Sequence, residues 1–256
     1  MSSNALSTQD AAPHVQSAGV FTQLLRRPGS AFGLALIALI VFCALSASYI
    51  TPYDPNDQPF DGLTIEGAPI APNSEHWMGT DLLGRDLLSR LIVGAQTSLI
   101  IGVVANGLSA ILGTAVGVAA GYFGGLTATV LMRFTDLMMA FPALLLAIVL
   151  AAIFEPSLWI VAMVIAMVNW VQMARVVYTE TRSLTERDFI QAQVSMGSGP
   201  LRVLIRHVLP HLLSSIVVFS TLGISTTVLL EATLSYLGVG VQPPTPSWGN
   251  IIFENQ

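Results

Sequence analysis

The chain has 256 residues, of which 53% are hydrophobic and only 10% are charged, and its net charge is −5. Globular domains carry roughly 25% charged residues, so this composition excludes an ordinary soluble domain, and the absence of a basic run argues against nucleic acid as a partner. All positive charges are arginine, so the lysine of a Walker A phosphate loop is missing and the chain is not itself a P-loop ATPase.

Residues 1–28 are rich in serine, alanine and glutamine and have no hydrophobic period. Such a segment buries too little apolar surface to fold, so it predicts a disordered tail. Residues 29–50 are apolar and predict a first transmembrane helix. The "ALSAS" near the end of this stretch also fits a signal-peptide cleavage site. The length of the stretch, the long tail before it and the four apolar stretches that follow favour a membrane helix.

Residues 51–94 form a predicted outer loop, because their first half is interrupted by prolines. Arg85 and Arg90 lie near its end, where we expect an interfacial helix. Residues 95–256 then form the predicted main transmembrane domain. A spanning helix needs about 20 apolar residues, and the sequence predicts an all-α integral membrane protein, a polytopic bundle of about five transmembrane helices. The five predicted spans cover residues 30–50, 96–120, 128–153, 157–177 and 211–230.

Arginines indicate how the spans are oriented, because cytoplasmic loops carry an excess of positive charge. Arg26 and Arg27 precede the first span, which predicts a cytoplasmic N-terminus. Counting crossings places the loop between spans four and five on the same side. Half of all the positive charge lies in that loop and at its edges, at Arg175, Arg182, Arg187, Arg202 and Arg206.

The second span carries two rows of small or short residues at four-residue spacing. Residues of this size let helix backbones approach closely in lipid, so each row predicts a packing interface, either within the chain or with a partner subunit. One row is Gly113, Gly117 and Gly121, and the other is Ser98, Gly102, Asn106 and Ala110.

The third span contains Arg133 and Asp136, three residues apart near its cytoplasmic start. Charges inside a membrane are costly and tend to pair, so we expect these two to form a structural ion pair. A proton relay is the alternative, but it usually needs more acidic or histidine groups than these spans hold. Phe141-Pro142 should kink the helix, because proline lacks the backbone donor.

The fifth span is rich in hydroxyl groups and has Glu231 near its outer end. These hydroxyls either bond back to their own helix or line a water-filled path, and the sequence leaves both possibilities open. If a path exists, two polar residues of span four could face it as well. The candidate path residues are Asn169, Gln172, Thr221, Ser225 and Glu231.

The cytoplasmic loop between spans four and five predicts two helices joined by a glycine turn. Residues 188–196 have a broad apolar face, and Gly197 can end that helix in the left-handed conformation. Ser198 or Gly199 can cap a second helix with Pro200 in its first turn, running to about Leu209, before Pro210. An exposed apolar helix face is typical of docking into a groove. The alternative is a helix that lies on the bilayer surface, which the offsetting acidic residues do not favour.

This loop resembles the EAA loop of permease subunits in binding-protein-dependent ABC importers. In that motif E-A-A, three residues, glycine, nine residues, a hydrophobic residue, one further residue and Leu-Pro follow one another. Here 191–193 (Gln-Ala-Gln) stands at the E-A-A position, Gly197 at the glycine and 209–210 at Leu-Pro. Three positions depart from the pattern: Gln191 replaces glutamate, Gln193 replaces the second alanine, and His207 replaces the hydrophobic residue.

Three further blocks resemble the dipeptide/oligopeptide/nickel group of these importers, specifically the second of its paired permeases. They are "HWMGTDLLGRDLLSRLIVGAQTSL" (76–99), "RFTDLMMAFPALLLA" (133–147) and "LLEATLSYLGVGVQPPTPSWGNII" (229–252). The resemblance implies a multi-pass protein of the bacterial inner membrane. It also implies three kinds of protein partner besides membrane lipid: a second permease, two cytoplasmic ATPases that bind ATP and magnesium, and an extracytoplasmic substrate-binding protein.

The resemblance implies that this chain carries motion rather than chemistry, with no cofactor or metal of its own. Substrate would be a short peptide, or alternatively a nickel chelate or another small solute. Each ATPase would receive one EAA loop, here at about 178–210, in a surface groove, and Gly197 would form the turn. The other residues that the resemblance assigns to this contact are Phe189, Ile190, Gln191, Ala192, Met196, Arg202 and Arg206.

Family members have a sixth span after the "SWGNII" segment, whereas this sequence ends after five. We therefore expect either a C-terminally truncated version of a longer product or a natural variant, and a non-transporting subunit remains an alternative. A secondary transporter would need acidic ion sites in the spans. An intramembrane metalloenzyme would rest on His207 and His211 alone, with Pro210 between them.

Overall fold

The computed structural model describes residues 26–255. The chain divides into two units, residues 1–42 and 43–256. The helix α2 (Pro28–Leu45) and the short helix α3 (Ala47–Ile50) account for the first predicted span. Most of the predicted tail, residues 1–25, lies outside the described residues.

The part of the chain from 26 to 255 is helical, with only two isolated β-bridges and no strand. Four helices are long and apolar enough to cross a membrane, or five if the bent pair of α5 and α6 counts as one span. This confirms the predicted all-α polytopic membrane fold. The remaining elements are α4 (Leu87–Phe123), α5 (Gly125–Ala140), α6 (Ala143–Ile153), α7 (Leu158–Thr185), α8 (Asp188–Ser195), α9 (Pro200–Val203), the π-turn η1 (Leu204–Val208), α10 (Leu209–Tyr236) and α11 (Trp248–Glu254).

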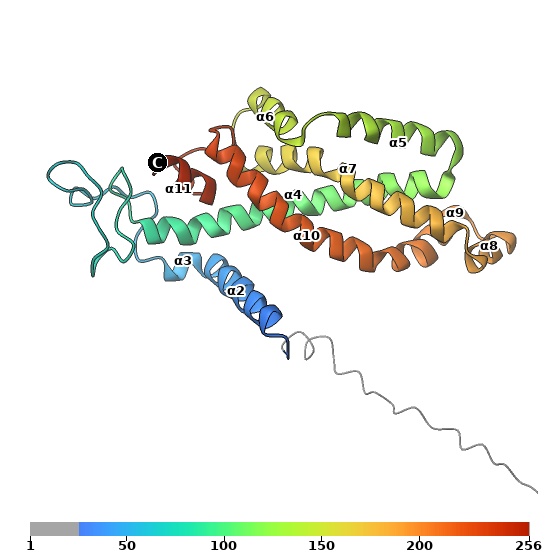
Figure 1. Cartoon of the computed structure of the whole chain (residues 1–256), viewed down its shortest axis with the longest axis horizontal. Helices are drawn as coiled ribbons and strands as arrows, with labels where there is room; N and C mark the ends of the chain where they lie inside the picture. The colour runs from blue at the N-terminus through green and yellow to red at the C-terminus, as the bar shows by residue number, and fades with distance from the viewer. Residues whose placement is uncertain (1–25, 256) are drawn as a thin grey trace, which may run out of the picture. The chain divides into compact units, whose positions relative to one another are not determined.

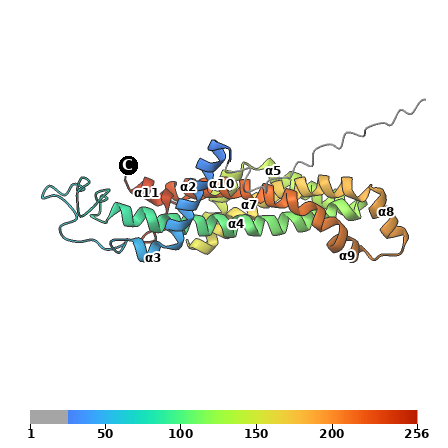
Figure 2. The same cartoon turned by 90° about the horizontal axis from the view of Figure 1, so that it is seen from below.

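The glycine row of α4 lies against α7, and the two helices run side by side in both views (Figures 1 and 2). Gly113, Gly117 and Gly121 are all buried. A Cβ added at Gly117 would lie 2.6 Å from the carbonyl oxygen of Ala174, and one at Gly113 would lie 2.6 Å from that of Trp170. The backbones therefore touch directly, so the row forms a packing interface within this chain.

The second row of small residues on α4 faces α10. The Ser98 hydroxyl donates to Glu231 Oε2 over 2.8 Å, and Asn106 Nδ2 donates to the carbonyl oxygen of Ser220 over 2.6 Å. Between them, a Cβ added at Gly102 would lie 2.7 Å from Val228 Cγ2. One helix thus uses two small-residue faces to hold two different neighbours.

The predicted kink at Phe141-Pro142 is a full break, with α5 and α6 bent by 89°.

The ion pair that the sequence predicted between Arg133 and Asp136 of α5 does not form. Asp136 pairs with Arg175 of α7, not with Arg133. Because α5 lies along α7, Arg175 meets the carboxylate from the neighbouring helix, while the Arg133 side chain stays exposed.

Arg85 and Arg90 do not lie on a separate interfacial helix, because α4 begins at Leu87 and continues across the membrane domain. Residues 51–86 hold no helix. Both arginines are buried, at 3% and 0% exposure. Their guanidinium groups share Glu254 Oε2, at 2.7 and 2.6 Å, and Arg85 Nε also bonds Asp81 at 2.7 Å. These carboxylates offset the charge of the two buried arginines.

Candidate functional site

The first helix of the loop between α7 and α10 ends at a glycine in the left-handed conformation, as the sequence predicts. Gly197 has φ of 81°, follows α8 and donates its N–H to the carbonyl of Val194. The next N–H, from Ser198, reaches back to Gln193 at 3.1 Å. This bonding satisfies carbonyl groups that the helix end would otherwise leave free, and it fixes a sharp turn after α8.

The second helix of the loop begins where predicted but does not end before Pro210. Gly199 is extended at its N-cap and Pro200 follows as the first helical residue. At the other end the N–H of Leu209 bonds to the carbonyl of Leu204, five residues back. This wider π-turn accommodates a proline that would otherwise clash with the preceding turn. Residues 200–236 therefore form one continuous helix.

Most of the residues that the sequence assigned to ATPase contact are exposed. Phe189 is 39% exposed and Met196 is 70% exposed, and Gln191 and Ala192 are also on the surface. Ile190 corrects the prediction, since it is only 1% exposed. Its side chain belongs to a core cluster with residues of the second loop helix and α10: Val203, Val208 and Leu212. Ile190 thus holds α8 against the rest of the chain rather than facing a partner.

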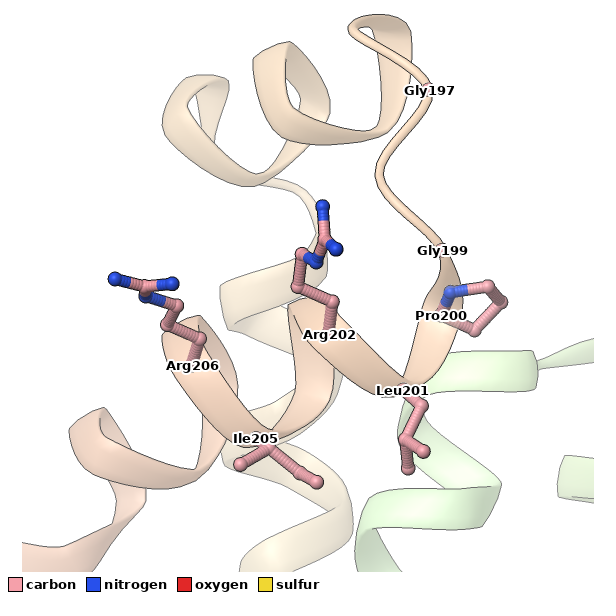
Figure 3. Close-up of a pocket in the computed structure, with 7 residues that line it drawn as sticks. All are labelled: Gly197, Gly199, Pro200, Leu201, Arg202, Ile205 and Arg206. Atoms are coloured by element: carbon pink, nitrogen blue, oxygen red, sulfur yellow. The ribbon is translucent and has the colours of Figure 1, made fainter.

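Arg202 and Arg206 are exposed and lie on one side of the second loop helix, while Leu201 and Ile205 lie on the adjacent side, about 100° round the helix, and point away from them (Figure 3). Within residues 26–255 neither guanidinium has an ion pair or a hydrogen bond. Together with Gly197, Gly199 and Pro200, these four side chains line an open cleft of about 660 Å³.

A polar cavity of about 260 Å³ lies among α4, α7 and α10. Of the predicted path residues, Asn169 and Gln172 line this cavity, whereas Thr221 and Ser225 do not. The Asn169 amide also donates to Thr227 Oγ1 over 3.2 Å. None of the lining residues is charged, and the remainder are Asn106, Ser109, Ala110, Met173, Phe219, Gly223, Thr226 and Leu230.

Glu231, which the sequence suggested as a path residue, does not line this cavity. Its carboxylate is fully buried and accepts hydrogen bonds from the hydroxyls of Ser98 and Ser235, both at 2.8 Å. Those same hydroxyls accept backbone N–H groups of Trp248 and Val241. Glu231 therefore joins α4 and α10 to the segment that follows α10, which is a structural role.

Asn106, Ser109 and Thr226 also line the cavity, which the sequence pattern did not indicate. The four-residue spacing of Asn106 with its small neighbours indicated packing, which it also serves through its bond to Ser220. A residue on a helix can contact a neighbouring helix and line a cavity at the same time, but its sequence spacing indicates only the contact with the neighbouring helix. The amide of Asn106 was the sequence feature that could have indicated a polar site, because an asparagine inside a membrane needs hydrogen-bond partners.

Comparison with known proteins places the chain in a family. The profile described as "Binding-protein-dependent transport system inner membrane component" matches residues 113–256. A second profile, "N-terminal TM domain of oligopeptide transport permease C", matches residues 16–69. The chain thus belongs to the binding-protein-dependent inner-membrane permeases, in the dipeptide/oligopeptide group, and is a multi-pass protein of the inner membrane.

Similar curated proteins agree with this placement. Over 235 residues, which are 91% of this chain and 76% of the relative, the chain is 40% identical to the glutathione transport system permease protein GsiD of Shigella dysenteriae serotype 1. It is 40% identical to the di/tripeptide transport system permease protein DppC of Pseudomonas aeruginosa, over 88% of this chain and 74% of that one. A putative peptide permease of Brucella suis is 35% identical, over 94% and 77%.

Proposed function

We propose that this chain is one permease subunit of an ATP-driven importer of short peptides and forms half of the translocation path with a second permease. The relatives named for transport carry glutathione, di- and tripeptides or peptides, which favours peptides over the alternative of nickel chelates. The polar cavity supports this choice, because its amides and hydroxyls can exchange hydrogen bonds with a peptide backbone without selecting for charge.

The observation that carries the proposal is the geometry of the cytoplasmic loop. α8 and its C-cap residue present exposed Phe189 and Met196, and the left-handed turn at Gly197 follows at once. An amphipathic helix with an exposed apolar face suits insertion into a groove of a partner. In this proposal, two cytoplasmic ATPase subunits bind ATP and magnesium and perform the hydrolysis, a binding protein delivers substrate from outside, and this chain is not an enzyme.

Met196→Asp is expected to separate the chain from its ATPases. A charge at the apolar face must be desolvated on entering the groove, which costs several kcal/mol. The tagged chain would be isolated from its native membrane in mild detergent, and its co-purifying ATPase subunits would be quantified. Ser195→Asp is the matched control, since it adds the same charge to the neighbouring exposed face of the same helix. Equal ATPase recovery with the parent and Met196→Asp would refute docking through α8.

Gly197→Pro tests the turn independently of the apolar face. Proline holds φ near −65° and cannot adopt the 81° found at Gly197, so α8 can no longer be presented at its present angle. We expect this variant to insert into the membrane in normal amount and to lose its ATPases. Normal co-purification would show that the turn is dispensable.

Gln172→Leu is expected to slow peptide uptake about twofold to tenfold, the effect of one lost hydrogen bond. Gln172 is exposed to the polar cavity, so its amide can serve a passing solute. Uptake of a labelled dipeptide by vesicles that contain the whole transporter provides the measurement. Thr221→Val serves as the control because its hydroxyl bonds back to its own helix and lies outside the cavity. A larger loss with Thr221→Val would move the path away from this cavity.

A further inference from the structure

An apolar groove of about 560 Å³ lies between α4 and the continuous helix 200–236. It adjoins the open cleft that contains Arg202 and Arg206, because Leu201 and Ile205 line both. Apart from the hydroxyl of Thr114, the groove lining has no polar side chain. The residues that line the groove are Ala110, Ile111, Thr114, Ala115, Val118, Leu201, Leu204, Ile205, Leu209 and Ile216.

The two surfaces divide the second loop helix into a basic side and an apolar side. In Figure 3 the guanidinium groups of Arg202 and Arg206 point to one side, and Leu201 and Ile205 point to the other, toward the neighbouring helix. The arginines are four residues apart, so both lie on one helix face, about one turn from each other. The predicted orientation puts the second loop helix at the cytoplasmic leaflet.

We propose that this combined surface binds one anionic phospholipid of the cytoplasmic leaflet. The lipid phosphate lies between Arg202 and Arg206, and one acyl chain follows the groove past Ile205. The groove extends along residues 110–118 of α4, a length of about 12 Å at the helical rise. Basic pockets next to membrane helices on the cytoplasmic side are typical sites for anionic lipid head groups.

A lipid satisfies both parts of this surface, whereas a protein partner satisfies only one. An apolar helix of a second permease would fill the groove but leave two exposed guanidinium groups without an anion. An acidic surface on an ATPase would pair with the arginines but would leave the apolar groove unfilled. An amphiphile with an anionic head and an apolar tail matches the arginines and the groove together. This inference goes beyond the proposed transport function and does not depend on it.

The test uses the full chain, purified from its native membrane and stripped of lipid in mild detergent, with bound lipids counted by native mass spectrometry. Dioleoylphosphatidylglycerol is the anionic probe, and dioleoylphosphatidylcholine, with the same acyl chains, is the neutral one. The parent should prefer the anionic lipid by about 30-fold, roughly fivefold for each arginine. Arg202→Gln/Arg206→Gln should abolish this preference. Arg182→Gln/Arg187→Gln, which removes two exposed arginines outside both surfaces, should retain it.

A second variant tests the groove without changing charge. Ala115→Phe fills the groove and should lower the affinity for both lipids about tenfold, while Ala152→Phe, on an exposed face of α6, should not. Soluble glycerol phosphate should fail to compete with the bound lipid, because it lacks the acyl chain. Competition by glycerol phosphate would overturn the proposal in favour of a site for a free phosphate.

Two further outcomes would also overturn it. One is an unchanged preference for phosphatidylglycerol in Arg202→Gln/Arg206→Gln, and the other is unchanged lipid binding in Ala115→Phe. If the arginine variant kept its lipid but lost its ATPases, these arginines would belong to the ATPase contact that the sequence predicts. Monodisperse elution of each variant establishes that the fold is intact.

Discussion

Gly117→Ala is expected to destabilise the chain by about 1–3 kcal/mol, the usual cost of overpacking a tight core. The new Cβ would lie 2.6 Å from the Ala174 carbonyl oxygen, 2.8 Å from Val177 Cβ and 2.9 Å from the Tyr178 backbone nitrogen. Two of these atoms are backbone, so no rotamer change relieves the clash and α7 itself must move away. The temperature at which half of the protein stops eluting as a monodisperse species in mild detergent measures the effect.

Gly107→Ala provides a matched control on the same helix. A Cβ at Gly107 would meet no atom within 4 Å, and alanine favours a helix over glycine by up to about 1 kcal/mol. Gly107→Ala should therefore be neutral or slightly stabilising. If the two variants behaved alike, the close approach of α4 and α7 would not contribute to stability, and the glycine row would reflect only the tolerance of membrane helices for glycine.

Glu254→Gln is expected to cost about 3–5 kcal/mol, the penalty for removing one partner of a buried charge pair. Glu254 Oε2 accepts hydrogen bonds from both Arg85 and Arg90, and Arg90 is completely buried. Asp81 alone would then remain for two guanidinium groups. Because Arg90 also donates to the carbonyl of Pro55, loosening the cluster should expose the outer segment 51–86. Faster cleavage of this segment by a protease added to the outside, together with a lower melting temperature, checks both parts.

Glu186→Gln is the control for this effect, because it makes the same chemical change in an exposed pair. Glu186 and Arg182 are 3.4 Å apart, and their side chains are 67% and 55% exposed. An exposed pair of this kind contributes at most about 1 kcal/mol. A loss at Glu254→Gln no larger than that at Glu186→Gln would mean that water reaches the outer cluster and screens its charges.

The elements that depend on local chemistry were predictable from the sequence. Long apolar stretches predicted the spans. Gly197, which can adopt the left-handed conformation, predicted the turn of the loop, and Pro200 predicted the start of its second helix. Phe141-Pro142 gave the position of the break between α5 and α6. The angle of that break did not follow, because proline removes one hydrogen bond but the packing of the two halves decides how far they diverge.

Features that depend on contacts between distant residues were not predictable. Asp136 finds its partner 39 residues along the chain, at Arg175, and Glu231 finds Ser98 at a separation of 133 residues. Helical spacing shows which residues share one face of a helix, but it does not show which residues of another helix pack against that face. For the same reason Ile190 was assigned to a docking face, although α8 turns it inward against Val203.

The unbroken helix from Pro200 to Tyr236 has a mechanical consequence. Its 37 residues make a rod about 55 Å long, so a tilt of about 5° at one end displaces the other by about 5 Å. In the proposed function Gly197 is the pivot at the cytoplasmic end, and the bonds from Ser235 through Glu231 to Ser98 form the attachment at the far end. In that proposal a displacement of α8 is transmitted along the helix as a rigid-body movement, which needs no chain of side-chain rearrangements in between.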